Sequence, residues 1–409
     1  MKTMGAVPAA FAGSEGGELV VGGRSASALV EAEGTPLFVY DRSVVERQVA
    51  MFRAAFDGVA LHYAVKANPF RPLLTAMADL VDGFDLASSG ELALLDAAGL
   101  VGPGLPLSLA GPGKSDAELG KAVQQRVCVH VESAGELERL LTIAAVRDQR
   151  AIVGVRVNPP FGLKGSGMKM GGLASQFGVD HEQVPALVRR IIEAKAEWRG
   201  LHVYAGSQSL SVDALIESQR ETVALAGQIA DDVGIAPSEV NLGGGFGIPY
   251  FAGDQPLDVQ SVGAALAREL KARPAILRDT KFVIELGRWL VGECGVYLTR
   301  VVDRKVSRGR TFLVVDGGLH HMLAASGNFG QLLRRNYPVA VASRLGEEPD
   351  EEVSVVGCLC TPLDLLADDV ALPRAEVGDV IAIFCAGAYG LTASPQAFLS
   401  QGAAREVLV

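Results

Sequence analysis

Two short apolar runs, IVGVRVN at residues 152–158 and LHVYAGS at residues 201–207, flank a segment of different character. That segment, VPALVRRIIEAKAEW at residues 184–198, has apolar residues at every third or fourth position, which is the period of an α-helix. A helical segment between two such runs predicts a βαβ unit with parallel strands. The fold then depends on how often this unit is repeated.

The same alternation extends over much of the chain. Segments of helical period, such as Arg71–Leu80, Glu91–Ala98, Ala134–Val146 and Val212–Val233, separate short apolar runs. Eight runs predict strands: Leu61–Asn68, Gly83–Ser88, Leu105–Ala110, Val127–Val131, Ile152–Asn158, Leu201–Ser207, Val240–Gly243 and Phe282–Leu286. Eight strands that alternate with helices predict a (β/α)8 barrel of the TIM type, with an open doubly wound sheet as the alternative.

Beyond Leu286 the pattern changes. Strand-like runs such as VGECGVYLTRVVDRKV, RTFLVVDGG, VSVVGCLC and DVIAIFCAGAYG follow one another, joined by turns. They predict an all-β, barrel-like C-terminal domain. We expect the α/β barrel to cover residues 37–286 and the β domain to cover residues 1–36 and 287–409.

The composition limits the function classes. The 409 residues include 37 Lys and Arg against 47 Asp and Glu, a net charge of −10, which is the wrong sign for sequence-independent nucleic-acid binding. No apolar run reaches the roughly 18 residues that a membrane span needs, and MKTMGAVPAAFAG at residues 1–13 resembles a loose tail. The five cysteines fit free thiols in a reducing compartment. A cytoplasmic globular protein without nucleic-acid or membrane partners is expected.

The C-terminal ends of barrel strands carry the chemistry of this fold. The first predicted strand ends in AVKAN at residues 64–68, which places Lys66 in apolar surroundings. Desolvation lowers the pKa of such an amine and suits it to attack a carbonyl carbon. The alternatives are that Lys66 pairs with a carboxylate or extends into solvent.

Other strand ends carry glycine, aromatic and charged residues. Gly243–Gly245 follow strand seven, where backbone N–H groups can surround a phosphate, although glycine runs also form ordinary turns. Tyr204 and Ser207 end strand six. Glu285 and Arg288 end strand eight, and a simple salt bridge would also explain them.

Taken together, these groups match the needs of pyridoxal phosphate. The amine can form an imine, the glycines and arginine can hold a phosphate, and a carboxylate can keep the pyridine nitrogen protonated. The six histidines and the Cys358-Leu359-Cys360 segment lack the spacing of a metal site, so no metal is expected.

The chain from about residue 36 to 400 resembles the fold-type III, pyridoxal phosphate-dependent amino-acid decarboxylases, the family of diaminopimelate and ornithine decarboxylases. The motifs that carry the resemblance are YAVKAN at 63–68, FDLASSGEL at 84–92, AGSQ at 205–208, GGGFG at 243–247, ELGR at 285–288, VDGG at 315–318, Cys-x-x-x-Asp at 360–364 and AGAYG at 386–390.

The resemblance implies a role for each matching residue. Lys66 corresponds to the lysine that binds the cofactor covalently, and Glu285 to the carboxylate at the pyridine nitrogen. The remaining cofactor contacts that it implies are Asp85, Arg156, Tyr204, Ser207, Gly243, Gly244, Gly245, Gly287, Arg288 and Tyr389, with Glu91 lining the same pocket. The substrate contacts that it implies are Arg288, Thr361, Asp364 and Tyr389. Cys360 corresponds to a second catalytic residue, which in the family reaches the partner subunit's active site together with Tyr389; a homodimer is therefore implied.

Departures from the family pattern narrow the range of possible substrates. Diaminopimelate decarboxylases place an Arg and a Tyr after VDGG and a Glu after the cysteine, whereas this chain has Ala324, Asn328 and Thr361. Diaminopimelate would lose its main clamps, and an unpaired buried charge costs several kcal/mol. Tyr204 stands where the family usually has His, and Leu286 where Pro is usual.

The stretches at 319–338, 360–373 and 390–400 resemble one branch of the family, which includes decarboxylases of aminoacyl groups tethered to a carrier protein and exosortase-associated proteins. This branch implies α-decarboxylation of an acidic group of the glutamyl or aspartyl type in biosynthesis, with a free small amino acid as the alternative substrate. Cys360 would return a proton to Cα, because a thiol is mostly protonated at neutral pH. The rival functions are an amino-acid racemase, which Glu285 and Cys360 argue against, and a non-catalytic cofactor-binding homologue, which Tyr204 leaves open.

A glycine-rich segment follows strand five. It reads FGLKGSGMKMGGLASQF at residues 161–177 and carries Lys164 and Lys169. Loops of this length in a compact barrel are often lids, so we expect a flap that orders over substrate and contacts an acidic carrier protein or its phosphopantetheine arm. The alternative is a solvated loop whose charges only aid solubility.

Overall fold

The computed structural model describes residues 2–11, 15–102, 104–165, 167–169, 171–172, 174–329, 331 and 334–409. It divides into two compact units. The barrel unit consists of residues 49–247 and 256–287, and the β unit consists of residues 1–48, 248–255 and 288–409.

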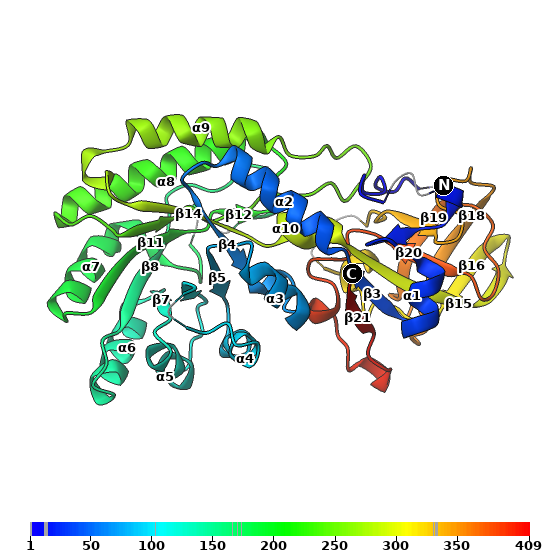
Figure 1. Cartoon of the computed structure of the whole chain (residues 1–409), viewed down its shortest axis with the longest axis horizontal. Helices are drawn as coiled ribbons and strands as arrows, with labels where there is room; N and C mark the ends of the chain where they lie inside the picture. Colours follow the sequence, from blue (N-terminus) through cyan, green and yellow to red (C-terminus); the bar gives the residue numbers. More distant parts are fainter. Residues whose placement is uncertain are drawn as a thin grey trace. The chain divides into compact units, whose positions relative to one another are not determined.

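Eight parallel strands form the barrel unit and confirm the predicted fold class (Figure 1). The strands are β4 (Ala60–Ala64), β5 (Gly83–Leu86), β6 (Leu107–Leu109), β7 (Cys128–Val131), β8 (Ile152–Asn158), β11 (Glu197–Val203), β13 (Glu239–Asn241) and β14 (Lys281–Leu286). Each strand pairs with the next along the chain, and β14 pairs with β4, so the sheet closes on itself. An open doubly wound sheet is thereby excluded.

Helices alternate with these strands. They are α3 (Arg71–Ala78), α4 (Ser89–Ala97), α5 (Asp116–Gln124), α6 (Ala134–Val146), α7 (Val184–Glu193), α8 (Val212–Val233) and α9 (Val259–Ala272). Serine hydroxyls cap α4, α5, α6 and α8 by accepting a backbone N–H of the first turn. The predicted helix 184–198 is too long: α7 ends at Glu193, because Lys195 adopts a positive φ of 57° and Glu197 already belongs to β11.

Three further short strands lie near the ends of β8 and β11. β10 (Val179–Asp180) extends the barrel sheet beside β8. β9 (Met168–Lys169) belongs to the glycine-rich segment and pairs antiparallel with β12 (Gly206–Ser207). The segment predicted as a flap therefore runs along the end of strand six.

The β unit is built around one mixed sheet. Its strands are β3 (Leu37–Tyr40), β15 (Gly295–Ser307), β16 (Arg310–Val315), β17 (Val339–Val341), β18 (Glu351–Val356), β19 (Leu365–Leu372), β20 (Val380–Ile383) and β21 (Arg405–Leu408). The shorter elements of this unit are β1 (Val20–Val21), β2 (Arg24–Ser25), α1 (Ala26–Glu33) and α10 (Arg288–Val291). Helix α2 (Arg42–Ala55) includes the residue at which the chain first passes from one unit to the other.

Two sequence expectations need correction. The strand Leu37–Tyr40 falls within the range predicted for the barrel, but it pairs with β15 and β21 of the β unit, because its residues are apolar on both faces and all four are buried there. Strand β4 ends at Ala64, so Lys66 does not lie in a strand. Within the described ranges, no helix combines the length and the apolar character that crossing a bilayer requires.

Candidate active site

The interior of the barrel unit is polar at a level where such barrels usually hold branched aliphatic side chains. Each of the eight strands contributes at least one buried polar residue, and one from each strand is considered together: His62, Asp85, Ser108, His130, Arg156, His202, Asn241 and Glu285. We call these eight residues the polar barrel core. The rings of His130 and His202 lie 4.7 Å apart although β8 separates their strands, so they meet through the barrel interior.

Lys66 lies directly after β4, in a single 3-10 turn (Val65–Ala67). Its Nζ is 4.0 Å from Glu285 Oε1 and 5.1 Å from the centre of the Tyr204 ring. The structure thus brings three predicted site residues together. The expected burial of the lysine is wrong, since 43% of its side chain is exposed: the strand ends two residues before it, and the turn directs it to the mouth of the barrel.

Glu285 is the buried carboxylate of this group. His202 Nε2 lies 3.0 Å from Glu285 Oε2, and Asn241 Nδ2 donates to the same oxygen at 3.2 Å. Burial acts to raise the pKa of Glu285. The close approach of His202, followed by the charges of Lys66 and Arg156, outweighs burial and holds the pKa of this carboxyl below its usual range.

The glycines after β13 are packed against backbone from neighbouring strands. Gly243 and Gly245 have positive φ values of 69° and 85°, which L side chains rarely adopt. A Cβ on Gly244 would overlap the carbonyl oxygen of Glu285, and one on Gly245 would overlap that of Gly206. The loop therefore presents bare backbone next to Gly206, the residue before Ser207, and its role as a phosphate cradle stays a prediction.

Gly287 has a related function at the end of β14. A Cβ there would lie 2.7 Å from the Ala67 Cβ and 3.2 Å from the Ala64 carbonyl oxygen. The absence of a side chain at Gly287 thus allows the end of strand eight to approach the turn that carries Lys66.

The other predicted pocket residues have their own partners. Asp85 accepts a hydrogen bond from Ser108 and lies 3.4 Å from His62 Nδ1, so it belongs to the polar barrel core. Arg156 pairs with Glu132 at 3.0 Å. Glu91 lies one turn into α4 and accepts the Ala87 N–H at 2.6 Å; burial raises the pKa of its carboxyl.

Arg288 and Tyr389 both lie in the β unit. The Arg288 guanidinium is 4.6 Å from the Tyr389 ring centre and 5.5 Å from that of Tyr250, and it donates to the Tyr250 hydroxyl at 2.8 Å. Its buried Nε has no hydrogen-bond partner, and no carboxylate of the described residues forms an ion pair with it. A cation that is half-buried between aromatic rings without a counter-charge is a suitable site for an anion.

The motif Cys-x-x-x-Asp forms a turn between β18 and β19. Cys360 is exposed, Thr361 is half-buried and Asp364 is 3% exposed. Both carboxylate oxygens of Asp364 accept backbone N–H groups, from Leu319 at 2.6 Å and from Leu359 at 2.8 Å. The contacts of Asp364 therefore support a structural role in place of the substrate contact that the resemblance implied.

The structure describes the side chain of only one of the two lysines that were predicted to contact a carrier protein. Lys164 is exposed and pairs with Glu217 of α8 at 2.8 Å. The side chain of Lys169 lies outside the described part of the structure, so its predicted contact stays a prediction. Gly167 donates to the Ser207 carbonyl at 2.8 Å, which attaches this segment to the strand end that carries a predicted phosphate contact.

Sequence reasoning missed the other five residues of the polar barrel core, namely His62, Ser108, His130, His202 and Asn241. The available signal was their position, because each is a polar residue within a short, mostly apolar run. Single polar residues in strands do not reveal whether they meet, because contact through a barrel interior requires the closed sheet.

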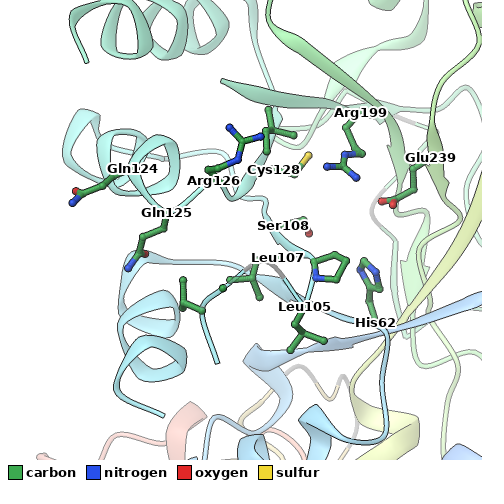
Figure 2. A pocket seen from close by; sticks show the side chains of 14 residues that line it. His62, Leu105, Leu107, Ser108, Gln124, Gln125, Arg126, Cys128, Arg199 and Glu239 are labelled. Carbon is green, nitrogen blue, oxygen red and sulfur yellow. The ribbon is translucent and has the colours of Figure 1, made fainter. Parts of the chain in front are cut away.

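A separate cavity of about 600 Å³ opens at the N-terminal ends of the strands (Figure 2). His62, Ser108, Cys128, Arg199 and Glu239 point toward it. None of the predicted cofactor residues lines this cavity, and catalytic residues of such barrels lie at the other strand ends. It is therefore not the candidate active site.

The residues at the C-terminal strand ends fit pyridoxal phosphate. An amine stands 4.0 Å from a buried carboxylate and beside an aromatic ring, and a loop in which side chains would collide offers bare backbone for a phosphate. Fold and site together define a barrel enzyme of the pyridoxal phosphate class.

Comparisons with known proteins give the family. The pyridoxal-binding domain of the pyridoxal-dependent decarboxylases matches residues 42–292. An L-glutamyl-[BtrI acyl-carrier protein] decarboxylase of Niallia circulans is 36% identical over 389 residues, covering 93% of this chain and 90% of that protein. A diaminopimelate decarboxylase of Archaeoglobus fulgidus is 34% identical, with 93% and 89% covered. The crystal structure of the diaminopimelate decarboxylase from M. jannaschii superimposes with a TM-score of 0.86 at 26% identity, covering 97% of this chain and 92% of that one.

The chain therefore belongs to the pyridoxal-dependent decarboxylases. It is a carboxy-lyase, and its cofactor is pyridoxal 5′-phosphate. The predicted family, cofactor and enzyme class are confirmed.

Proposed function

We propose that this enzyme α-decarboxylates an acidic aminoacyl group, of the glutamyl or aspartyl type, that is tethered to a carrier protein. Loss of the α-carboxylate requires that this group be free, so the carrier is attached through the side-chain carboxyl. A thioester or amide at that position is neutral. The far end of such a substrate needs no charged clamp.

The observation that carries this proposal is the lack of charge at the positions expected to hold the far end of a substrate. Ala324 is buried and apolar, and Thr361 is uncharged. Asn328 is occupied within its own turn, donating to the Ser326 hydroxyl at 2.8 Å, and the Asp364 carboxylate is held by backbone N–H groups. A free distal ammonium or carboxylate would lie there without a partner, which is costly. The Niallia circulans relative, whose name describes a carrier-bound glutamyl substrate, supports the same conclusion.

The cofactor, when bound, supplies an electron sink for the pair of electrons that carbon dioxide leaves behind. We assign Lys66 to hold the cofactor aldehyde, and Glu285 to hold a proton on the pyridine nitrogen. Tyr204 packs on the ring face, and Ser207 with Gly243–Gly245 surrounds the phosphate. Arg288 and Tyr389 provide an anion site for the phosphate or the substrate carboxylate.

Cys360 is assigned to return a proton to Cα after carbon dioxide has left. Its exposure at a turn of the β unit suits a residue that acts on another subunit. We therefore propose a homodimer in which Cys360 of one protomer completes the site of its partner, while Tyr389 stays with Arg288 of its own chain. We also place the protein in the cytoplasm, where its thiols stay reduced.

The decisive experiment measures carbon dioxide release from the cofactor-loaded enzyme with two substrate pools. One contains glutamyl and aspartyl groups tethered to carrier proteins, and the other contains free amino acids, including glutamate and diaminopimelate. We expect turnover on the tethered pool, accompanied by the loss of one carbon dioxide from the mass of the carrier. Turnover confined to a free amino acid would contradict the carrier assignment.

A further inference from the structure

The contacts of Glu285 show an arrangement that the proposed reaction does not use. Glu285 is 4% exposed; its nearest described groups are His202, Asn241 and Lys66, with Arg156, His62 and His130 farther off but within electrostatic range. His202 is itself 2% exposed, and it approaches from β11, two strands away from β14. The imidazole therefore reaches the carboxylate through the barrel interior.

Burying the His202 imidazole at this position costs free energy. Its Nδ1 is buried without a hydrogen-bond partner, and so is Nδ1 of His130, whose ring packs against it at 4.7 Å. Unsatisfied buried polar atoms destabilise a fold, and aliphatic residues ordinarily fill barrel interiors without this cost. The compensating feature is the 3.0 Å contact between His202 Nε2 and Glu285 Oε2.

The geometry of this contact indicates what His202 does. His202 Nε2 lies 3.0 Å from the carboxylate oxygen but does not meet the geometry of a hydrogen bond, so the contact is close and electrostatic. An imidazole beside a carboxylate favours the ionised over the protonated form of that carboxylate, whether the imidazole acts as a neutral N–H donor or as a cation. Asn241 donates to the same oxygen while its own Oδ1 accepts the Gly243 N–H at 2.8 Å, which fixes the orientation of that amide.

We propose that His202 is a positioning residue, which orients the Glu285 carboxylate and keeps it ionised so that it holds a proton on the ring nitrogen of the cofactor. This inference rests on the proposed contact between Glu285 and that nitrogen. It extends the site by a residue that touches neither cofactor nor substrate. His202 acts only through Glu285.

The test uses cofactor binding to the cofactor-free protein, not turnover. The dissociation constant is measured for pyridoxal phosphate and for its 1-deaza analogue, in which a carbon replaces the ring nitrogen. Both molecules carry the same aldehyde and phosphate, so the ratio of the two constants reports only on the ring nitrogen. A charge-assisted hydrogen bond corresponds to a preference of about tenfold or more, so we expect the wild-type protein to prefer pyridoxal phosphate by at least that factor.

Four variants at Glu285 and His202, with a fifth as control, show which residues the preference for pyridoxal phosphate depends on. Glu285→Gln and His202→Leu should both reduce it to less than about threefold, because each removes the ionised, oriented carboxylate. His202→Gln, whose longer amide can donate near the Nε2 position, should restore most of it, whereas the shorter His202→Asn should not. His130→Leu is the matched control: it removes a buried imidazole of the same barrel core that does not touch Glu285, and it should retain the wild-type preference.

The possible failures are distinguishable. Equal binding of the two molecules by the wild-type protein would show that Glu285 does not engage the ring nitrogen, which contradicts the proposed function of Glu285 itself. A wild-type preference that Glu285→Gln abolishes and His202→Leu leaves intact would overturn the inference while that function stands. If His202→Leu does not fold, the comparison of His202→Gln with His202→Asn decides, and equal preferences in these two variants would overturn the inference.

Discussion

Replacing Asp364 by alanine should destabilise the β unit without acting on substrate binding directly. The Asp364 carboxylate accepts the Leu319 and Leu359 N–H groups at 2.6 and 2.8 Å, and both of those residues are buried. Alanine leaves both N–H groups without an acceptor. Each unsatisfied buried N–H costs about 1–3 kcal/mol, so the two together cost about 2–6 kcal/mol.

Part of this cost is offset, because the variant no longer has to bury a carboxylate, whose pKa is raised by that burial. From the middle of that range, allowing for this offset, a net loss of about 2 kcal/mol remains, which lowers the Tm of a domain of this size by about 4–8 °C. The assay is thermal unfolding of the cofactor-free protein, followed by circular dichroism. Asp350→Ala is the matched control, since Asp350 is exposed and surface substitutions usually change stability by less than about 0.5 kcal/mol.

The glycines around Asp364 give a second test of the same reasoning. A Cβ on Gly318 or Gly357 would meet the Asp364 carboxylate oxygens, so Gly357→Ala should also lower the Tm. An Asp364→Ala variant with the wild-type Tm and a strongly raised KM would refute the structural role. It would restore the substrate contact that the sequence predicted for Asp364.

Four further predictions concern the active site and the assembly. Gly244→Ala should weaken binding of pyridoxal phosphate by tenfold or more, because its methyl group overlaps the Glu285 carbonyl oxygen; equilibrium dialysis of the cofactor checks this. Glu285→Gln should remove stability that is present at neutral pH: the depressed pKa of Glu285 stabilises the fold above the usual carboxyl range near 4.3, and this contribution is lost progressively as the pH falls from that range toward the depressed pKa. Denaturation of both proteins between pH 7 and pH 3 should show their stabilities converging at low pH, and a constant difference would contradict the assigned cause. Cys360→Ala should leave cofactor binding intact while impairing product formation, and an unchanged product yield would remove Cys360 from the mechanism. Mixing Lys66→Ala with Cys360→Ala protein should restore activity, because a dimer of one subunit of each variant contains one intact shared site. No recovery after verified subunit exchange would argue against shared sites.

The barrel could be predicted from the sequence because its signal is local. Strands such as Ile152–Asn158 are buried along their whole length and mostly apolar, as expected for parallel strands covered on both faces, and the helical period between them is unambiguous. The ends of elements were less accurate. Lys195 ends α7 early through its backbone conformation, and β4 ends before Lys66, so local torsions that residue type alone does not specify moved both boundaries.

Which strands pair, and which groups form hydrogen bonds, could be determined only from the tertiary structure. Leu37–Tyr40 is apolar enough for either unit, and only its pairing with β15 and β21 decides where it belongs. Asp364 matched a motif whose sequence suggests an active-site group, yet its buried carboxylate binds backbone N–H groups that lie 45 residues upstream and 5 residues upstream.

The sequence by itself determined the eight-stranded barrel, the family, the cofactor and the positions of Lys66, Tyr204, Glu285 and the glycine loop, because motifs and periodicity are properties of neighbouring residues. The tertiary structure decided which of these groups meet. Lys66 and Glu285 are more than 200 positions apart, and they lie within 4.0 Å only because β14 closes the sheet against β4. His202 reaches Glu285 through the barrel interior for the same reason: contacts across a closed sheet depend on strand order and stagger, which a linear pattern does not encode.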